Sequence, residues 1–180
     1  MRKEIRISGF GGQGVGLAGF ILGKAFSIYT DLEAVMTQSY GPEARGGASS
    51  ANIVVADRPI DFPFVQNADI LVALSQEAYT RYRPEAKPDA LVLIDNGLVS
   101  PLDDDAVLKI PATNLAESLG RRIVANMVML GFFASHTDIV QSDAVKEAIE
   151  TSVRPKTIPL NLEAFQMGFE YIMTEEQIVE

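Results

Sequence analysis

A glycine-rich segment at residues 9–16 is the first part of the chain whose residue types could bind a ligand. It contains five glycines in eight residues, directly after a strand-like run and directly before a helix-like run. Gly9, Gly11 and Gly14 follow the G-x-G-x-x-G spacing, with Gly12 and Gln13 between them. Glycine lets backbone N–H groups approach a ligand closely, and the N-terminus of the following helix attracts negative charge. The segment therefore predicts a cradle for a phosphate or another anion.

A nicotinamide dinucleotide is one candidate for this cradle. Such a site also needs an Asp or Glu at the end of the second strand. The second strand-like run, residues 34–37, is instead followed by Gln38 and Ser39, and Glu33 precedes it. A tight turn without a ligand, a different anion and a protein partner are the other interpretations that the residues leave open.

A second polar loop, residues 38–47, leaves the end of the second predicted strand. Ser39, Tyr40, Glu43 and Arg45 place a hydroxyl, a phenol, a carboxylate and a guanidinium within a few residues. The fork-shaped Arg45 guanidinium suits a phosphate or carboxylate, and an ion pair with Glu43 or a contact with a partner subunit is the alternative. Since ligands of open α/β sheets bind at the carboxyl ends of the strands, we expect this loop to join the glycine segment in one site.

Ser75 follows a third apolar run, residues 69–74, at the same predicted edge. It is a candidate binding hydroxyl, or alternatively the cap of a short helix. The chain has no G-x-S-x-G motif, and its one histidine, His136, falls at the predicted end of a helix. We therefore predict no catalytic residue, and the sequence is more typical of a component of an enzyme than of a complete one.

Composition excludes several classes of protein. The net charge of −9 argues against a sequence-independent nucleic-acid binder and against binding to an anionic membrane surface. The absence of cysteine excludes disulfides, a thiol nucleophile and thiolate ligands for a metal or cluster. No signal peptide and no apolar run of about 20 residues is present, so we expect a cytoplasmic protein without a membrane span.

Strand-like and helix-like runs alternate along the 180 residues. This alternation predicts an α/β fold: a single Rossmann-like domain, residues 1–180, with a mostly parallel sheet and helices on both faces. Residues 122–135 are almost wholly apolar, which predicts a helix that is buried on most sides. We expect Asn161 to cap the final helix.

Three segments together resemble a known family: residues 9–16 (GFGGQGVG), 37–47 (TQSYGPEARGG) and 74–78 (LSQEA). They resemble the gamma subunit, or gamma domain, of the 2-oxoacid:ferredoxin oxidoreductases, and the likeness runs from about residue 3 to the final helix. Within the family the second segment is most similar to the 2-oxoglutarate branch, and enzymes for branched-chain 2-oxoacids and indolepyruvate are the alternatives. A free-standing nucleotide-binding oxidoreductase or regulator, and a purely structural subunit, are the alternatives to the family assignment.

The resemblance implies a role in a complex that oxidatively decarboxylates a 2-oxoacid to an acyl-CoA and passes electrons to ferredoxin. It implies alpha and beta partners and a ferredoxin-like delta subunit, which carry thiamine diphosphate, magnesium and iron–sulfur clusters. The gamma component contributes architecture and, in some members, part of the coenzyme A environment. We therefore expect this chain to be inactive alone, and its predicted coenzyme A contacts come from the residues already singled out: Gly9, Gly11, Gly12, Gln13, Gly14, Ser39, Tyr40, Glu43, Arg45 and Ser75.

Overall fold

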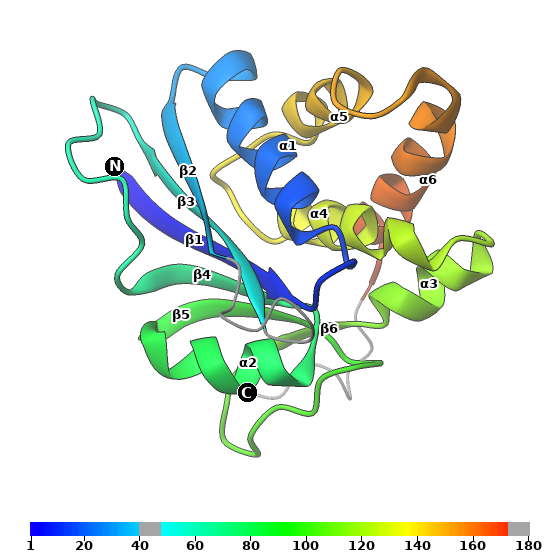
Figure 1. Ribbon diagram of the computed structural model, residues 1–180, viewed down its shortest axis with the longest axis horizontal. Helices are drawn as coiled ribbons and strands as arrows, with labels where there is room; N and C mark the ends of the chain where they lie inside the picture. The colour runs from blue at the N-terminus through cyan, green and yellow to red at the C-terminus, as the bar shows by residue number, and fades with distance from the viewer. Residues whose placement is uncertain (40–47, 173–180) are drawn as a thin grey trace.

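Strand β1 (Arg2–Gly9) lies in the middle of a six-stranded sheet (Figure 1). The computed structural model describes residues 1–39 and 48–172. The strand order is β2-β3-β1-β4-β5-β6. The other strands are β2 (Glu33–Ser39), β3 (Ser49–Ala56), β4 (Ala68–Ala73), β5 (Ala86–Asp95) and β6 (Leu108–Ile110).

The sheet is mostly parallel, with one reversed strand. β1 pairs in parallel with β4, β4 with β5, and β5 with β6. β3 is antiparallel to both of its neighbours, β1 and β2, so β2 runs in the same direction as β1. The predicted fold class is confirmed, and β3 is its one departure from a parallel sheet among the described strands.

Helices cover both faces of the sheet (Figure 1). The described helices are α1 (Val15–Tyr29), α2 (Gln76–Tyr82), α3 (Ala112–Ser118), α4 (Ala125–Ser135), α5 (Ser142–Glu150) and α6 (Ile158–Phe169). Short 3-10 turns at Arg83–Glu85, Arg122–Val124 and Pro155–Thr157 precede β5, α4 and α6. None of these helices is both long and apolar enough to cross a lipid bilayer.

Side-chain alternation along the central strands builds a core on each face. Ile70 and Val72 of β4 join the larger core with α1, α4, α5 and α6. Leu71 and Ala73 of the same strand point to the other face and join a smaller core with α2. Since successive side chains of a strand point to opposite faces, the continuous apolar run of β4 is what a strand covered on both faces requires.

The helices α4 and α6 are in direct backbone contact where two glycines meet. A Cβ atom on Gly131 would lie 1.9 Å from the Phe165 carbonyl oxygen, and one on Gly168 would lie 1.8 Å from the Val128 carbonyl oxygen. Any side chain at either position would therefore separate the helices. This contact holds α6 against α4, and segments next to both helices line the cleft described below.

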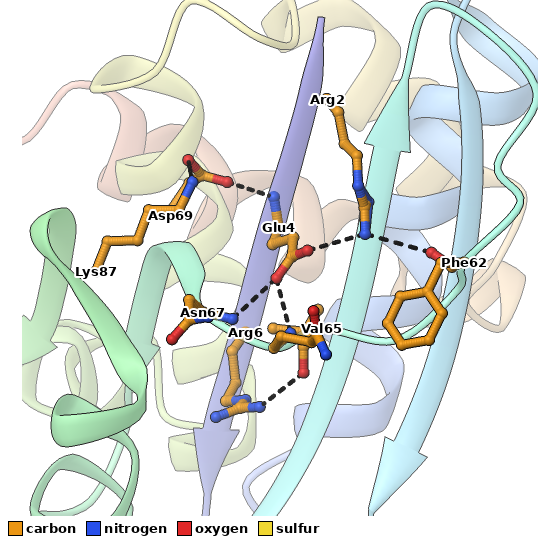
Figure 2. A network of polar contacts seen from close by, with 9 residues as sticks. Arg2, Glu4, Arg6, Phe62, Val65, Asn67, Asp69 and Lys87 are labelled. Carbon is orange, nitrogen blue, oxygen red and sulfur yellow. Dashed lines mark hydrogen bonds and ion pairs between the residues drawn. The ribbon is translucent and has the colours of Figure 1, made fainter.

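A polar network on β1 orders the connection between β3 and β4 (Figure 2). The Glu4 carboxylate accepts hydrogen bonds from the backbone amides of Gln66 and Asn67 at 2.8 and 3.0 Å. The Arg2 guanidinium joins this carboxylate at 2.9 Å to the carbonyl of Phe62 at 3.3 Å. The connection has no helix or strand of its own, so these side chains supply the hydrogen bonds that position its backbone.

The buried Arg6 belongs to the same strand and lies under α2. Its Nε donates to Asn52 Oδ1 at 2.7 Å, its Nη1 pairs with Glu85, and its guanidinium carbon lies 4.7 Å from the centre of the Tyr82 ring. A buried charge is tolerated only where it is paired and hydrogen-bonded, and Arg6 meets both conditions.

A second ionic cluster fastens α2 to the segment that precedes β6. The Asp105 carboxylate accepts from Arg83 Nε at 2.8 and 2.9 Å and from the Tyr79 hydroxyl. Burial alone would raise the pKa of Asp105, but the hydrogen bonds from Arg83 and Tyr79 outweigh it and lower this pKa below its usual 3.8. The same bond raises the pKa of Arg83.

We expect this cluster to give the fold an acid-sensitive contribution to stability. Because the folded-state pKa of Asp105 is lowered, its contribution is complete above about pH 4 and is lost as the pH falls through the folded-state value. Asp105→Asn should lower the unfolding free energy at pH 7 by about 1–3 kcal/mol and flatten its decline below pH 4. Urea denaturation at several pH values measures this, with the exposed Asp103→Asn as control. Equal pH profiles for Asp105→Asn and the parent chain would contradict the assignment.

Candidate anion-binding site

The glycine segment forms an open loop between β1 and α1. Gly12 and Gly14 have φ angles of +93° and +73°, which glycine adopts without strain. A Cβ atom on Gly11 or Gly12 would meet no atom within 4 Å among the described residues, so the backbone here is accessible. The loop thus has the conformation and the exposure that close backbone approach by a ligand requires.

Gln13 fixes the loop to the sheet. Its Oε1 accepts from the Phe10 amide at 2.6 Å, and its Nε2 donates to the Leu74 carbonyl at the end of β4 at 2.7 Å. The Gln13 amide also closes a turn onto the Phe10 carbonyl at 3.2 Å. Gln13 therefore stabilises the loop, and both polar atoms of its side chain are hydrogen-bonded within the protein.

The start of α1 has backbone amides for which no side chain in the described residues acts as a cap. Gly14 is the N-cap and has no side chain to accept from the first turn, and that turn contains no acidic residue. The first N–H groups of a helix have no acceptor within the helix, and the helix dipole gives this end a partial positive charge. An anion beside Gly14 would accept hydrogen bonds from these N–H groups and would be attracted by the partial positive charge.

A cleft of about 690 Å³ opens beside this helix end. It lies between the start of α1, the turn that precedes α4, and the turn that precedes α6. Its lining mixes apolar, polar and basic side chains: Gly14, Leu17, Arg121, Ile123, Val124, Asn126, Ser152, Val153, Arg154, Lys156, Thr157, Leu160 and Asn161. The mixture suits a ligand with both apolar and anionic parts.

Three cations of this cleft are available for a ligand. Arg121, Arg154 and Lys156 are exposed, and none of them forms a salt bridge with any residue in the ranges 1–39 and 48–172. Within the described part of the chain, the neighbouring Arg122 makes one long ion pair, with Glu117 at 3.7 Å. Four of the 15 basic residues of a chain with net charge −9 thus gather at this one place.

A narrower cavity of about 190 Å³ continues the site along the edge of the sheet. It lies between the glycine loop, the end of β4 and the start of α3, and is lined by Gly12, Gln13, Leu74, Thr113, Arg122, Ile123 and Ala125. Ile123 lines both cavities, and its side chain is 58% exposed. The two cavities therefore adjoin, with the glycine loop on one side of both.

The residues predicted to bind a ligand fall into three groups. Gly9, Gly11, Gly12, Gln13 and Gly14 form the loop just described. Ser39 is exposed at the end of β2 and pairs with Ser50 of β3, which in turn pairs with Ser8 of β1. Ser39 therefore lies at the same edge as the loop, but two strands away, about 10 Å at ordinary strand spacing. Tyr40, Glu43 and Arg45 lie outside the described residues.

Ser75 is buried and caps α2. Its Oγ accepts from the Ala78 amide at 3.2 Å, and only 1% of the residue is exposed. The alternative interpretation of Ser75 as a helix cap is therefore confirmed, while a role in ligand binding stays a prediction. His136 likewise has a local role at the end of α4, where its Nδ1 lies 2.9 Å from the Phe132 carbonyl oxygen.

The position of Glu33 does not suit a dinucleotide. Glu33 begins β2, at the opposite end of that strand from the edge that bears the glycine loop. The antiparallel β3 also separates β2 from β1. β4, the parallel strand that pairs with β1, ends at Ala73 and is followed by Leu74 and Ser75, so it does not end in the carboxylate that a ribose would require.

The basic cleft is the part of the site that sequence reasoning missed. Arg121 and Arg154 are 33 positions apart and come together only through the packing of α4 and α6. The short pattern Arg154-Pro155-Lys156 and the pair Arg121-Arg122 are the only local signals. Neither is distinctive in a single sequence. Among the described residues, no group of His, Asp and Glu side chains is arranged to hold a metal ion.

Comparisons with known proteins agree on one family. Residues 4–171 match the family described as pyruvate ferredoxin/flavodoxin oxidoreductase. The chain is 53% identical over 175 residues to the 2-oxoglutarate synthase subunit KorC of Methanocaldococcus jannaschii, and the match covers 94% of each chain. It is 50% identical over 182 residues to the subunit of the same name from Methanothermobacter marburgensis, covering 96% of this chain and 98% of that one.

A solved structure has the same fold. The gamma subunit of a keto/oxoacid ferredoxin oxidoreductase from Geobacter sulfurreducens superposes with a TM-score of 0.86 at 42% sequence identity. The superposition covers 94% of this chain and 95% of that one.

Two glycine substitutions test the geometry of the loop. Gly14→Ala should lower the free energy of unfolding by at least about 1 kcal/mol, because φ is +73° and the new Cβ would lie 2.4 Å from Asn126 Nδ2. Gly11→Ala, which meets no such contact and has no positive φ, should change it by less than about 0.5 kcal/mol. Urea denaturation of both variants measures the difference. Equal stabilities would mean that the turn at Gly14 is not the one described.

Proposed function

The chain belongs to the pyruvate ferredoxin/flavodoxin oxidoreductase family, and we propose that it is the gamma subunit of a 2-oxoglutarate:ferredoxin oxidoreductase. The observation that carries this proposal is the 53% identity to a 2-oxoglutarate synthase subunit over nearly the whole of both chains. Relatives that are named for ketoisovalerate and for pyruvate match at 31% and 33% identity. The chain acts as one subunit of an oxidoreductase, and we assign the oxidative decarboxylation of 2-oxoglutarate to the assembled complex.

The cofactors of this reaction belong to the partner subunits. The sequence has no cysteine that could hold an iron–sulfur cluster. We assign thiamine diphosphate, magnesium and the clusters to alpha, beta and ferredoxin-like delta subunits, with ferredoxin as the electron acceptor. What this chain's own residues can do is bind and orient an anionic substrate.

We further propose that coenzyme A is this substrate and that its phosphates lie between the glycine loop and the basic cleft. The loop and the start of α1 offer backbone donors and a positive helix end, and Arg121, Arg154 and Lys156 offer charge. The cleft of about 690 Å³ suits the broad, phosphorylated nucleotide. The adjoining cavity of about 190 Å³ suits the slender pantetheine arm. Ser39, Tyr40, Glu43, Arg45 and Ser75 remain proposed contributors.

Reconstitution tests the subunit assignment. The purified chain should be colourless and inactive, because its sequence has no cysteine to hold a cluster and we assign the catalytic residues to the partner subunits. Addition of alpha and beta subunits should produce dye reduction that requires both 2-oxoglutarate and coenzyme A. Pyruvate, 2-oxoisovalerate and indolepyruvate should support less turnover. Turnover by the isolated chain, or a preference for another 2-oxoacid, would overturn the proposal.

Substitution of the cleft cations tests the coenzyme A assignment. In the reconstituted complex, Arg121→Ala or Arg154→Ala should raise the KM for coenzyme A about ten- to a hundredfold, since a hydrogen bond to a charged group contributes about 1.5–3 kcal/mol. The KM for 2-oxoglutarate should stay unchanged. Arg58→Ala, which removes an exposed cation from the β3–β4 connection, is the matched control. If the cleft variants and the control behave alike, coenzyme A does not bind there.

The Arg45→Ala variant distinguishes a ligand contact from a subunit contact in the second loop, residues 38–47. A ligand contact predicts a rise in the coenzyme A KM of the same size as for the cleft cations. A subunit contact predicts weaker assembly with both KM values unchanged. Analytical ultracentrifugation and steady-state kinetics on the same preparation distinguish the two outcomes, and the second would remove Arg45 from the proposed site.

A further inference from the structure

Asn126 is a buried polar residue at the start of α4, a helix whose other buried residues are apolar. The buried residues of α4 run from Asn126 to Ala134, and Asn126 is the only one of them with a polar side chain. The residue is 3% exposed. Burying an amide costs free energy unless its hydrogen bonds are replaced, so an apolar residue of this size would suit the core of the helix better.

The Asn126 amide makes its hydrogen bond to the glycine loop. Its Nδ2 donates to the carbonyl oxygen of Gly14 at 3.2 Å, across 112 positions of sequence. The same carbonyl accepts from the Ala18 amide at 2.9 Å, the first hydrogen bond of α1. The helix therefore keeps its own bond at this carbonyl whether or not Asn126 is present.

Holding the Gly14 carbonyl also sets the direction of the next amide. The peptide between Gly14 and Val15 is planar and trans, so its C=O and N–H point in opposite directions. With the carbonyl bound by both Asn126 and Ala18, the Val15 N–H points out of the start of α1. This is one of the amides that lack an acceptor within the helix.

Asn126 also lines the basic cleft, together with Arg121 and Arg154. It thus lies between the loop that would donate backbone hydrogen bonds and the side chains that would supply charge. Its contact with Gly14 is close enough that a Cβ on that glycine would lie 2.4 Å from Nδ2. A side chain on Gly14 would therefore require Asn126 to move.

We propose that Asn126 is a positioning residue that aims the amides at the start of α1 into the cleft, and so sets the affinity for the anionic substrate. This inference rests on the proposed function, in which coenzyme A phosphates occupy the site. Asn126 acts through the Gly14–Val15 peptide. It therefore influences substrate binding and leaves the chemistry in the partner subunits unaffected.

The test uses Asn126→Ala and Asn126→Ser in the reconstituted complex. Asn126→Ala should raise the KM for coenzyme A about 5- to 30-fold, with kcat and the KM for 2-oxoglutarate unchanged. Asn126→Ser, which keeps a donor, should recover part of the affinity. Hydrogen exchange of residues 9–17, measured without coenzyme A, should be faster in Asn126→Ala than in the parent complex.

Thr137→Val is the matched control. Thr137 Oγ1 donates to the Phe133 carbonyl at 3.0 Å, so this variant also removes a side-chain hydrogen bond to a backbone carbonyl near α4, but away from the loop. It should leave the coenzyme A KM and the exchange of residues 9–17 unchanged. If Asn126→Ala does not assemble, Asn126→Ser alone tests the positioning role, through the KM for coenzyme A and the hydrogen exchange of residues 9–17.

The outcomes separate this inference from the proposed function. If Arg121→Ala raises the coenzyme A KM and the Asn126 variants do not, the positioning role is wrong and the proposed site stands. If none of these variants changes the coenzyme A KM, the proposed site is wrong. In that case the hydrogen exchange of residues 9–17 still tests whether Asn126 holds the Gly14–Val15 peptide. Unchanged exchange overturns the positioning role as well, and faster exchange supports this structural part of it. Faster exchange with an unchanged coenzyme A KM, while Arg121→Ala raises it, also overturns the positioning role.

Discussion

The central position of β1 constrains most of the molecule. The strand pairs with the antiparallel β3 on one side and the parallel β4 on the other, so both of its edges are hydrogen-bonded. Ile5 and Ile7 face the larger core, while Glu4 and Arg6 order the β3–β4 connection and the underside of α2. Its end then becomes the glycine loop. A shift of this strand by one residue would exchange core and polar side chains and displace the loop as well.

Basic side chains serve two different purposes in this fold. Arg6 and Arg83 are largely buried, bind carboxylates and hold segments of irregular backbone or helix in place. Arg121, Arg154 and Lys156 are exposed at the cleft and pair with no carboxylate in the described part of the chain. These cations, which have no carboxylate partner in the described residues, contrast with the net charge of −9 of the whole chain. That contrast is why the cleft suits an anionic ligand.

Local sequence patterns predicted the elements better than they predicted the contacts among them. The apolar runs predicted the strands and the buried helix α4, because the hydrophobic pattern of an element is visible within a few consecutive residues. The reversal of β3 was not predicted, since a strand of either direction gives the same apolar run. Asn161 does not cap the final helix: Pro159 in the first turn lets α6 begin at Ile158, and Asn161 Nδ2 instead donates to the Thr157 carbonyl at 2.7 Å. The cleft depends on residues far apart in sequence, and so on packing that no local pattern contains.

A subunit can govern the turnover of a complex if it binds the part of the substrate that does not react. Binding energy from remote groups holds the reacting end in place and offsets the entropy lost when the complex closes around it. The thiol of coenzyme A lies at the far end of its pantetheine arm from the nucleotide. The proposed site for the nucleotide and phosphates on this chain would therefore leave the thiol free to reach a neighbouring subunit. In this proposal the glycine loop, the cleft and Asn126 bind the part of coenzyme A that does not react, and the partner subunits carry out the chemistry.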